Sequence, residues 1–120
     1  MNPGEQRGPV AYSDDAVDLL YVRDCGRALA ALQTARELRH PIYNVGSGVA
    51  TTNARFAAAL RASVPEAEVA LSPGRGPNAV PGDPYLDVTR LRADTGHQPA
   101  DDLEGAVADY VEWLRAGNAL

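Results

Sequence analysis

The stretch Pro41-Ile42-Tyr43-Asn44-Val45-Gly46-Ser47-Gly48 decides the fold of this 120-residue chain, and Val49-Ala50-Thr51-Thr52 follows it directly. Residues 42–45 are largely apolar and β-prone, so they predict a short buried strand. The glycines predict a tight turn, and Thr51 or Thr52 can cap the helix that follows. A strand that leads through a glycine turn into a helix is typical of α/β folds that handle nucleotides.

Further elements are predicted on both sides of this stretch from the spacing of apolar residues. Short strands are expected at 17–22, 42–45 and 67–71. The first expected helix runs from the cap Asp24 to near Arg39, and the second runs from Thr51 or Thr52 to Pro65. The third covers residues 88–95 and ends before Gly96, and the fourth runs from the cap Asp101 to Gly117. Because strands alternate with helices, the fold class is α/β with a thin parallel sheet. We expect residues 1–16 to be a flexible lead-in and residues 17–117 to form a single domain.

Composition excludes several classes of function. The net charge of −5 argues against a nucleic-acid partner. The lone Cys25 cannot form an internal disulfide, and His40 and His97 have no neighbours at metal-ligand spacing. Neither a membrane-length apolar run nor a secretion signal at Met1–Gly8 is present, so we expect a cytoplasmic protein of bacterial type.

Five motifs, in this order, resemble the carboxyl-terminal portion of the extended short-chain dehydrogenase/reductase family, whose members include NAD(P)-dependent sugar-nucleotide epimerases and dehydratases. The matching segments are Tyr21-Val22-Arg23-Asp24, Tyr43-Asn44-Val45-Gly46-Ser47-Gly48, Asp87-Val88-Thr89-Arg90-Leu91, Thr95-Gly96-His97-Gln98-Pro99 and Tyr110 to Leu114. The resemblance extends over residues 17–115. It implies a small, incomplete Rossmann-like parallel sheet with flanking helices, on the substrate side of such an enzyme.

The resemblance also shows what this chain lacks. The family uses a Tyr-x-x-x-Lys pair in hydride transfer, and all 11 basic residues here are arginines. Arginine is a poor substitute for that lysine because its planar, fixed charge places donors differently. The glycine-rich turn that binds the dinucleotide is missing as well. We therefore expect no catalytic, cofactor-binding or metal-binding residue, and NAD(P) only together with an amino-terminal half.

Three residues are the candidates for substrate binding. Tyr43 and Asn44 could line a sugar pocket, or they could pack and hydrogen-bond locally. Arg75 lies in a loop, where binding residues concentrate, although it could simply be solvated. The turn at Gly46–Gly48 could likewise hold a phosphate or serve only as a tight turn. Valine occupies both positions where relatives carry phosphate-binding arginines, Val17 and Val80, which weakens the expectation of a nucleotide sugar.

Two functions remain open from the sequence. The first is the substrate-side portion of an NAD(P)-dependent epimerase/dehydratase-like protein, as a truncated gene product or one piece of a split enzyme. Such a portion would need a Rossmann-domain partner and would not catalyse alone. The alternative is a stand-alone, non-catalytic module of the same origin that binds a ligand or self-associates through an exposed sheet edge. Neither reading requires a nucleic acid or a membrane.

Overall fold

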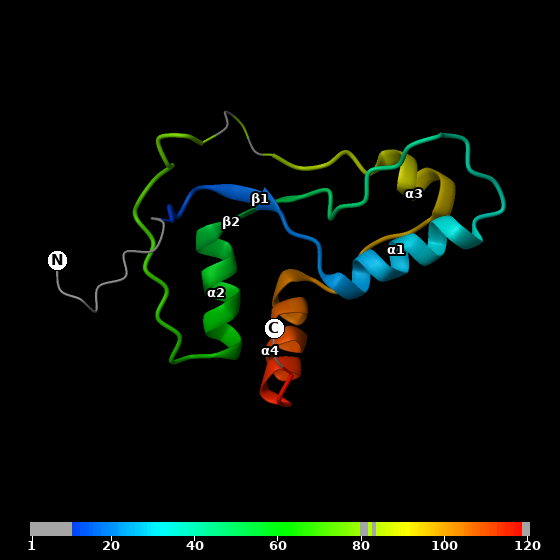
Figure 1. The fold of residues 1–120 in the computed structure, drawn as a ribbon. Helices are drawn as coiled ribbons and strands as arrows, with labels where there is room; N and C mark the ends of the chain where they lie inside the picture. Colours follow the sequence, from blue (N-terminus) through cyan, green and yellow to red (C-terminus); the bar gives the residue numbers. More distant parts are fainter. Residues whose placement is uncertain (1–10, 80–81, 83, 119–120) are drawn as a thin grey trace.

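A computed structural model describes residues 11–79, 82 and 84–118 of the chain. In chain order its elements are β1 (Ala16–Asp18), α1 (Val22–Thr34), β2 (Ala50–Thr52), α2 (Asn53–Ser63), α3 (Thr89–Thr95) and α4 (Leu103–Arg115) (Figure 1). The α/β class and the incomplete sheet with flanking helices are confirmed. None of the helices in this described part is long and apolar enough to cross a membrane.

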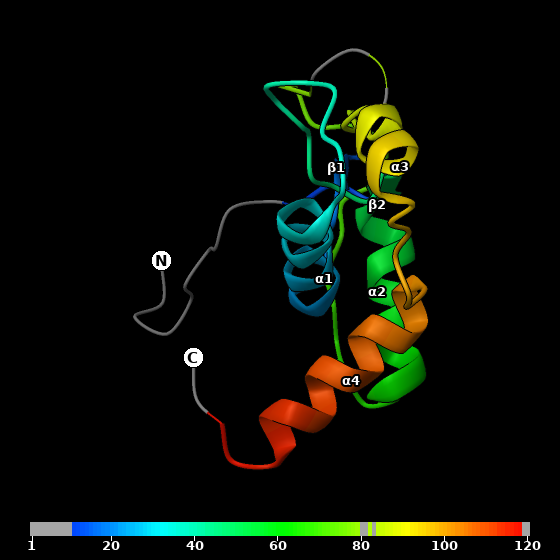
Figure 2. The same ribbon diagram turned by 90° about the vertical axis from the view of Figure 1, so that its right-hand side faces the viewer.

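The helices form two separate pairs. Helix α2 packs beside α4, and α1 packs beside α3, while the short sheet lies between the pairs (Figures 1 and 2). The chain extends over 59 × 39 × 24 Å and has a radius of gyration of 17.3 Å. A compact chain of this length has a radius of gyration of about 14 Å. The two helix pairs therefore do not close around one common core.

The sheet corrects the expectation of parallel pairing. Strands β1 and β2 pair antiparallel, with Ala16 opposite Thr52 and Asp18 opposite Ala50. The reason is a tertiary contact, since the turn at Gly46–Gly48 is hydrogen-bonded to Asp18 at the end of β1. The chain therefore leaves the turn and runs back along β1.

Two predicted strands form no ladder with the described residues. Residues 42–45 and 67–71 lie outside the sheet and have no regular secondary structure. Close to the second of these, Ser72 forms one isolated parallel bridge with Tyr12. Of the predicted lead-in, residues 1–10 lie outside the described part of the chain.

Helix ends follow the sequence in α2 and α3 and depart from it in α1 and α4. Thr52 caps α2 by accepting a hydrogen bond from Arg55 N, and Gly96 ends α3 with φ +71°. Asp24 is not the cap of α1, because the helix begins at Val22 with Tyr21 as its N-cap. In α4, Asp102 rather than Asp101 accepts from Gly105 N at 2.8 Å.

Helix α1 also ends earlier than predicted, at Thr34 instead of near Arg39. Ala35 has extended backbone angles, and Arg39 N beyond it donates to Asp94 in α3 at 3.1 Å. A continued helix would carry this segment away from Asp94. The tertiary hydrogen bond therefore replaces the last helical turn.

The buried core is small. Ala28 of α1, Val88 at the N-cap of α3 and Leu91 of α3 form its main cluster, with Leu32, Tyr43 and Val45 packed against them. Fully buried large side chains are scarce, since among the large side chains of the described residues only Leu91 has an exposed fraction below 2%. Twelve large hydrophobic residues in the described part are exposed instead. Much of the apolar side-chain surface of the described residues is thus left exposed.

Candidate functional site

The turn at Gly46–Gly48 binds an anion, and that anion belongs to the chain itself. Asp18 Oδ1 accepts hydrogen bonds from Ser47 N at 2.8 Å and from Ser47 Oγ at 2.6 Å. Asp18 Oδ2 accepts from Gly48 N at 3.1 Å and from Leu86 N at 3.0 Å. The backbone N–H groups that a phosphate would use are therefore occupied by a carboxylate.

Both glycines of this turn are needed for that geometry. Gly48 has φ +77°, which side-chain-bearing residues rarely adopt. A Cβ at Gly46 would lie 2.9 Å from Asp18 Oδ2 and 3.0 Å from Leu86 Cδ1. The sequence predicted the turn, but it gave no sign that Asp18, some thirty residues earlier, fills it.

The electrostatics favour the ionised form of Asp18. Partial burial raises the pKa of Asp18, yet the hydrogen bonds from Ser47, Leu86 and Gly48 together outweigh burial and lower the pKa below its ordinary value of 3.8. The carboxylate thus connects β1, the turn before β2 and the segment that leads to α3. Its role here is structural.

A second cluster gathers around Asp94 of α3, whose side chain is only 2% exposed. Its Oδ2 accepts hydrogen bonds from Tyr43 Oη at 2.5 Å and from Arg39 N at 3.1 Å. The same oxygen lies 3.1 Å from His40 Nδ1. Tyr43 Oη in turn accepts from His40 N at 3.2 Å. One carboxylate oxygen therefore fixes the whole loop that follows α1.

These contacts shift two pKa values in opposite directions. The hydrogen bond from Tyr43 is the main reason why the pKa of Asp94 falls to about 2, with further hydrogen bonds from Arg39 and His40. Burial, followed by the hydrogen bond to Asp94, raises the pKa of Tyr43 above its ordinary value of 10. Tyr43 therefore stays protonated at neutral pH and acts as a donor to Asp94.

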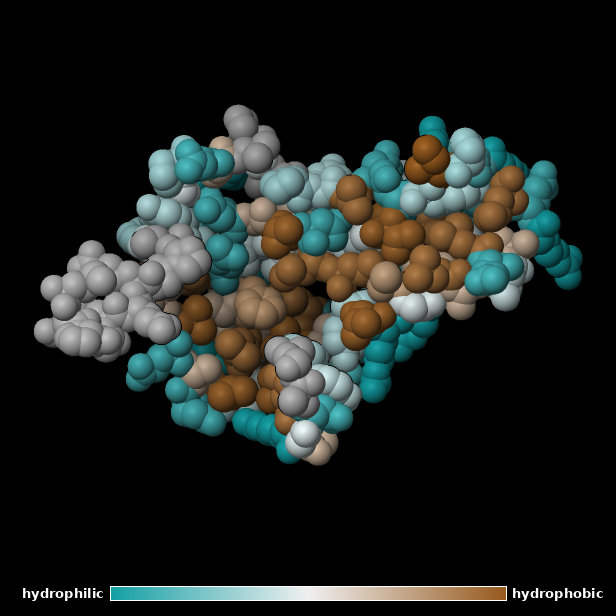
Figure 3. Space-filling view, viewed as in Figure 1, coloured by the Kyte–Doolittle hydropathy of each residue, from teal (hydrophilic) through white to brown (hydrophobic). Residues whose placement is uncertain are grey.

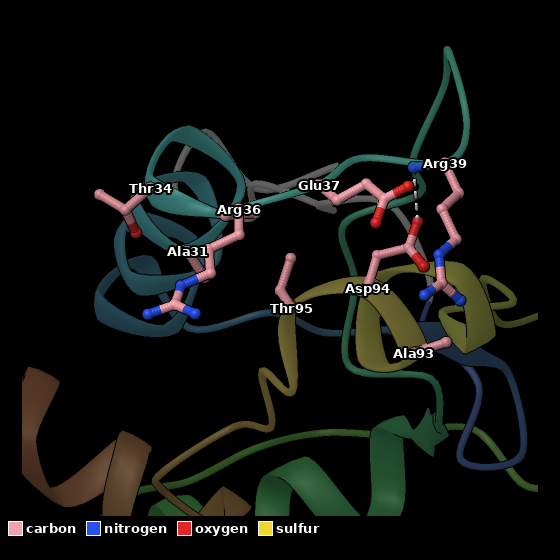
Figure 4. Close-up of a pocket in the computed structure, with 9 residues that line it drawn as sticks. Ala31, Thr34, Arg36, Glu37, Arg39, Ala93, Asp94 and Thr95 are labelled. Carbon is pink, nitrogen blue, oxygen red and sulfur yellow. Dashed lines mark hydrogen bonds between the residues drawn. The ribbon is translucent and has the colours of Figure 1, made fainter.

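A pocket of about 410 Å³ lies beside this cluster, between the end of α1 and α3. Its polar lining includes Arg36, Glu37, Arg39 and Asp94 (Figure 4). The guanidinium groups of Arg36 and Arg39 lie on opposite sides of Asp94 and do not converge (Figure 4). This pocket is therefore not arranged as a clamp for phosphate.

The three residues predicted to bind substrate are not brought together by hydrogen bonds. Tyr43 belongs to the Asp94 cluster, whereas Asn44 Nδ2 donates to the carbonyl oxygen of Asp87 at 3.1 Å. Arg75 donates to the carbonyl oxygen of Gly82 at 3.2 Å in a separate loop. Val80, one of the positions compared with phosphate-binding arginines, lies outside the described residues.

A larger groove of about 680 Å³ runs between α2, α4 and the segment from β1 to α1. Figure 3 shows apolar surface gathered over the middle of this face, continuous with the surface of α1. Leu19, Phe56 and Tyr110 line the groove and are 37–41% exposed, with Arg55 and Asp101 also in its lining. This surface suits an apolar partner better than a charged ligand.

The described residues carry no group of three histidine, cysteine, aspartate or glutamate side chains placed to hold a metal ion. The hydrogen bond that Tyr21 donates to Asp109 of α4 is another internal link, which joins the start of α1 to the pair formed by α2 and α4.

Comparisons with known proteins agree with this description. No protein-family model matches the chain, and no curated protein matches it. Among solved structures it is similar to a GalE-like L-threonine dehydrogenase from Cupriavidus necator in its apo form, with 28% identity and a TM-score of 0.69. It is also similar to a partial-consensus L-threonine 3-dehydrogenase, with 28% identity and a TM-score of 0.65.

These matches cover nearly all of this chain and a minor part of the other proteins. They span 88–92% of this chain, but only 36–41% of the two dehydrogenase chains. The chain is thus homologous to a part of GalE-like threonine dehydrogenases and has the fold of a fragment of a short-chain, Rossmann-like dehydrogenase.

Proposed function

We propose that this chain is the substrate-side part of an NAD-dependent GalE-like dehydrogenase, and that it is active only together with a nucleotide-binding part. The observation that carries this proposal is the coverage of the solved structures. The match takes in 88–92% of this chain, and the remaining majority of each dehydrogenase has no counterpart here. The absence of lysine agrees, because the family's Tyr-x-x-x-Lys pair then has to come from elsewhere.

For the substrate, we propose a small β-hydroxy amino acid such as L-threonine. Both similar structures are named as L-threonine dehydrogenases. The side chains also favour a substrate without a diphosphate. Val17 stands in β1 where nucleotide-sugar relatives carry an arginine, and the N–H groups of the Gly46–Gly48 turn are taken by Asp18.

A nucleotide sugar is the second candidate substrate. The order of the five sequence motifs favours it, since that order resembles sugar-nucleotide epimerases and dehydratases. The two candidates differ in one testable property, because a diphosphate needs positively charged or N–H partners and a small amino acid alcohol does not.

The test uses a fused protein, in which this chain replaces the matching segment of the Cupriavidus necator dehydrogenase. We expect the fused protein to form NADH from NAD and L-threonine, and the chain alone to form none. UDP-sugars serve as the competing substrate. Activity of the chain alone would contradict the proposal. So would a fused protein that binds NAD, melts cooperatively and turns over neither substrate.

A further inference from the structure

The pocket of about 410 Å³ between the end of α1 and α3 is lined by charged side chains that are not paired with one another. Arg36, Glu37 and Arg39 belong to this lining, and their side chains form no hydrogen bond or ion pair with another described residue. Exposed charges are ordinarily solvated, so their lack of partners alone has no meaning. What distinguishes this pocket is a buried charge beside them.

That buried charge is Asp94, whose side chain is 2% exposed and lines the same pocket. Its Oδ2 is engaged by Tyr43, by Arg39 N and by His40, whereas its Oδ1 accepts no hydrogen bond from a described residue. The carboxylate is ionised at neutral pH, because the pKa of Asp94 is about 2. A buried acceptor without a donor is unfavourable. A donor group on a ligand in the pocket would supply the missing hydrogen bond.

Opposite charges lie on different walls of the pocket (Figure 4). Arg36 lies along the wall formed by the end of α1, where the negative end of the helix dipole favours a guanidinium group. Glu37 and Asp94 extend from the other side, where the loop after α1 meets α3. Arg39 lies on the side of Asp94 that faces away from Arg36. The pocket therefore has one basic wall and one acidic wall.

This arrangement of charge selects the class of ligand. A simple cation would be attracted by Glu37 and Asp94 but repelled by Arg36, and a simple anion would meet the reverse. A molecule with one ammonium and one carboxylate group matches both walls, through hydrogen bonds that are strengthened by charge. The volume of about 410 Å³ lies within the range of roughly 300–1,000 Å³ that is typical of small-molecule sites.

We propose that this pocket binds a free amino acid. The ammonium group of the ligand donates to Glu37 and to Asp94 Oδ1, and its carboxylate accepts from Arg36. The inference goes beyond the proposed function and does not depend on it, because every residue that it uses lies in this chain. Since Asp94 also holds the loop after α1, a bound amino acid stabilises this loop and raises the melting temperature of the chain.

The experiment is a titration of the chain with three related probes, followed by residue-resolved amide NMR. L-alanine carries both charges, propanoate carries only the carboxylate and ethylamine carries only the ammonium group. We expect L-alanine to shift the amides of residues 34–39 and 93–95 saturably, with a dissociation constant on the order of 1 mM. Propanoate and ethylamine should each bind at least about fivefold more weakly. L-alanine has no hydroxyl group, so its binding is independent of any dehydrogenase activity.

Substitutions with matched controls test the individual contacts. Glu37→Gln and Arg36→Gln each remove one charge from an exposed residue, so the fold should tolerate both. Each should weaken the binding of L-alanine at least about fivefold. Arg39→Gln is the control within the pocket, and Glu66→Gln is the control at an exposed position outside its lining. Both controls should change the binding by less than about twofold, because charges without a direct contact are screened.

The outcomes are distinct from those of the fused protein. Ethylamine that binds as tightly as L-alanine would identify a cation site, and propanoate that does so would identify an anion site, and either result overturns the inference. The absence of saturable shifts at residues 34–39 and 93–95 overturns it as well. So does an effect of Arg39→Gln as large as that of Arg36→Gln. The activity of the fused protein tests the proposed function separately.

Discussion

Asp18 is the residue on which the middle of this structure depends. It is one acidic side chain in an otherwise apolar strand, and its carboxylate accepts four hydrogen bonds from Ser47, Gly48 and Leu86. Those donors come from two segments far along the chain. The carboxylate of Asp18 therefore accepts hydrogen bonds from N–H groups of the kind that bind a phosphate in a nucleotide site.

Replacing Asp18 by Asn tests that role. Asparagine keeps the shape but loses the charge, and its amide N–H₂ group faces donors, so we expect a loss of about 1–3 kcal/mol in the free energy of unfolding. Urea unfolding measures the change. Asp14→Asn is the matched control, because Asp14 is exposed and, among the described residues, its carboxylate accepts a hydrogen bond only from its neighbour Ser13. Equal effects of the two substitutions would contradict the structural role.

Asp94 makes stability depend on pH. Its pKa falls from 3.8 to about 2 in the folded chain. A carboxylate with a lowered pKa stabilises the folded state above its unfolded-state pKa, and this stabilisation is lost as the pH falls through the folded-state value. We therefore expect Asp94→Asn to flatten the urea-midpoint profile over the interval from 3.8 to about 2.

Tyr43→Phe is the companion variant for that profile, because it removes the hydrogen bond with the largest effect on the pKa of Asp94. In this variant the pKa of Asp94 lies closer to its ordinary value of 3.8, so the loss of stability on acidification should be smaller and should end at a higher pH than in the unaltered chain. An unchanged profile in both variants would show that the Asp94 cluster does not govern acid sensitivity.

Helix α4 shows how far one element can be predicted. Its extent and its apolar face are evident from the sequence, and the structure places it at Leu103–Arg115. The predicted cap was wrong by one residue. Asp102 caps the helix, while Glu104 in its first turn forms an ion pair with Arg55 of α2 at 3.2 Å.

A pair of adjacent substitutions measures this difference. Asp102→Ala should reduce the free energy of unfolding by about 1 kcal/mol, the usual value of an N-cap. Asp101→Ala should cost less, because its carboxylate has only a surface contact of 3.9 Å with Arg27. Thermal and urea unfolding of both variants provide the comparison. A larger loss for Asp101→Ala would restore the cap expected from the sequence.

Segment 42–45 is the element in which sequence and structure complement each other. Its composition predicted a strand, and the structure shows a segment without a ladder among the described residues. Local sequence determines the alternation of side chains, with Tyr43 and Val45 packed against the core and Ile42 exposed. A ladder depends on a second strand, and the described part of this chain does not supply one.

At the scale of the whole molecule, the chain leaves many large apolar side chains exposed. The buried hydrophobic residues of its described part are few and mostly small, and helices α2 and α4 supply only Ala57, Ala59 and Val107 of them. The groove between α2 and α4 leaves further apolar side chains open. These features are those expected if a further part covers this surface, as the proposed function requires.

This shape predicts how the isolated chain responds to changes on its surface. The double variant Val22→Gln with Leu29→Gln should change the free energy of unfolding by less than about 0.5 kcal/mol per site, because both side chains are exposed. The same variant should bind less of a hydrophobic fluorescent dye. Leu91→Ala is the contrast, since Leu91 is 1% exposed and its truncation should cost about 2–5 kcal/mol.

A large loss of stability in the double variant would contradict the exposure of Val22 and Leu29 on the surface of α1. It would mean that Val22 and Leu29 already pack against residues of the same chain. Unchanged dye binding would likewise count against a docking surface on this side of the molecule.

The sequence alone determined the α/β class, the turn at Gly46–Gly48 and the existence of the four helices found among the described residues. These features depend on interactions within a few residues, which composition and spacing record directly. Only the tertiary structure decided that Asp18 fills the turn, that β1 and β2 run antiparallel, that α1 stops at Thr34 and that Asp94 fixes the loop behind it. Each of these depends on groups some thirty to sixty residues apart, and no local pattern specifies which distant donor meets which carboxylate.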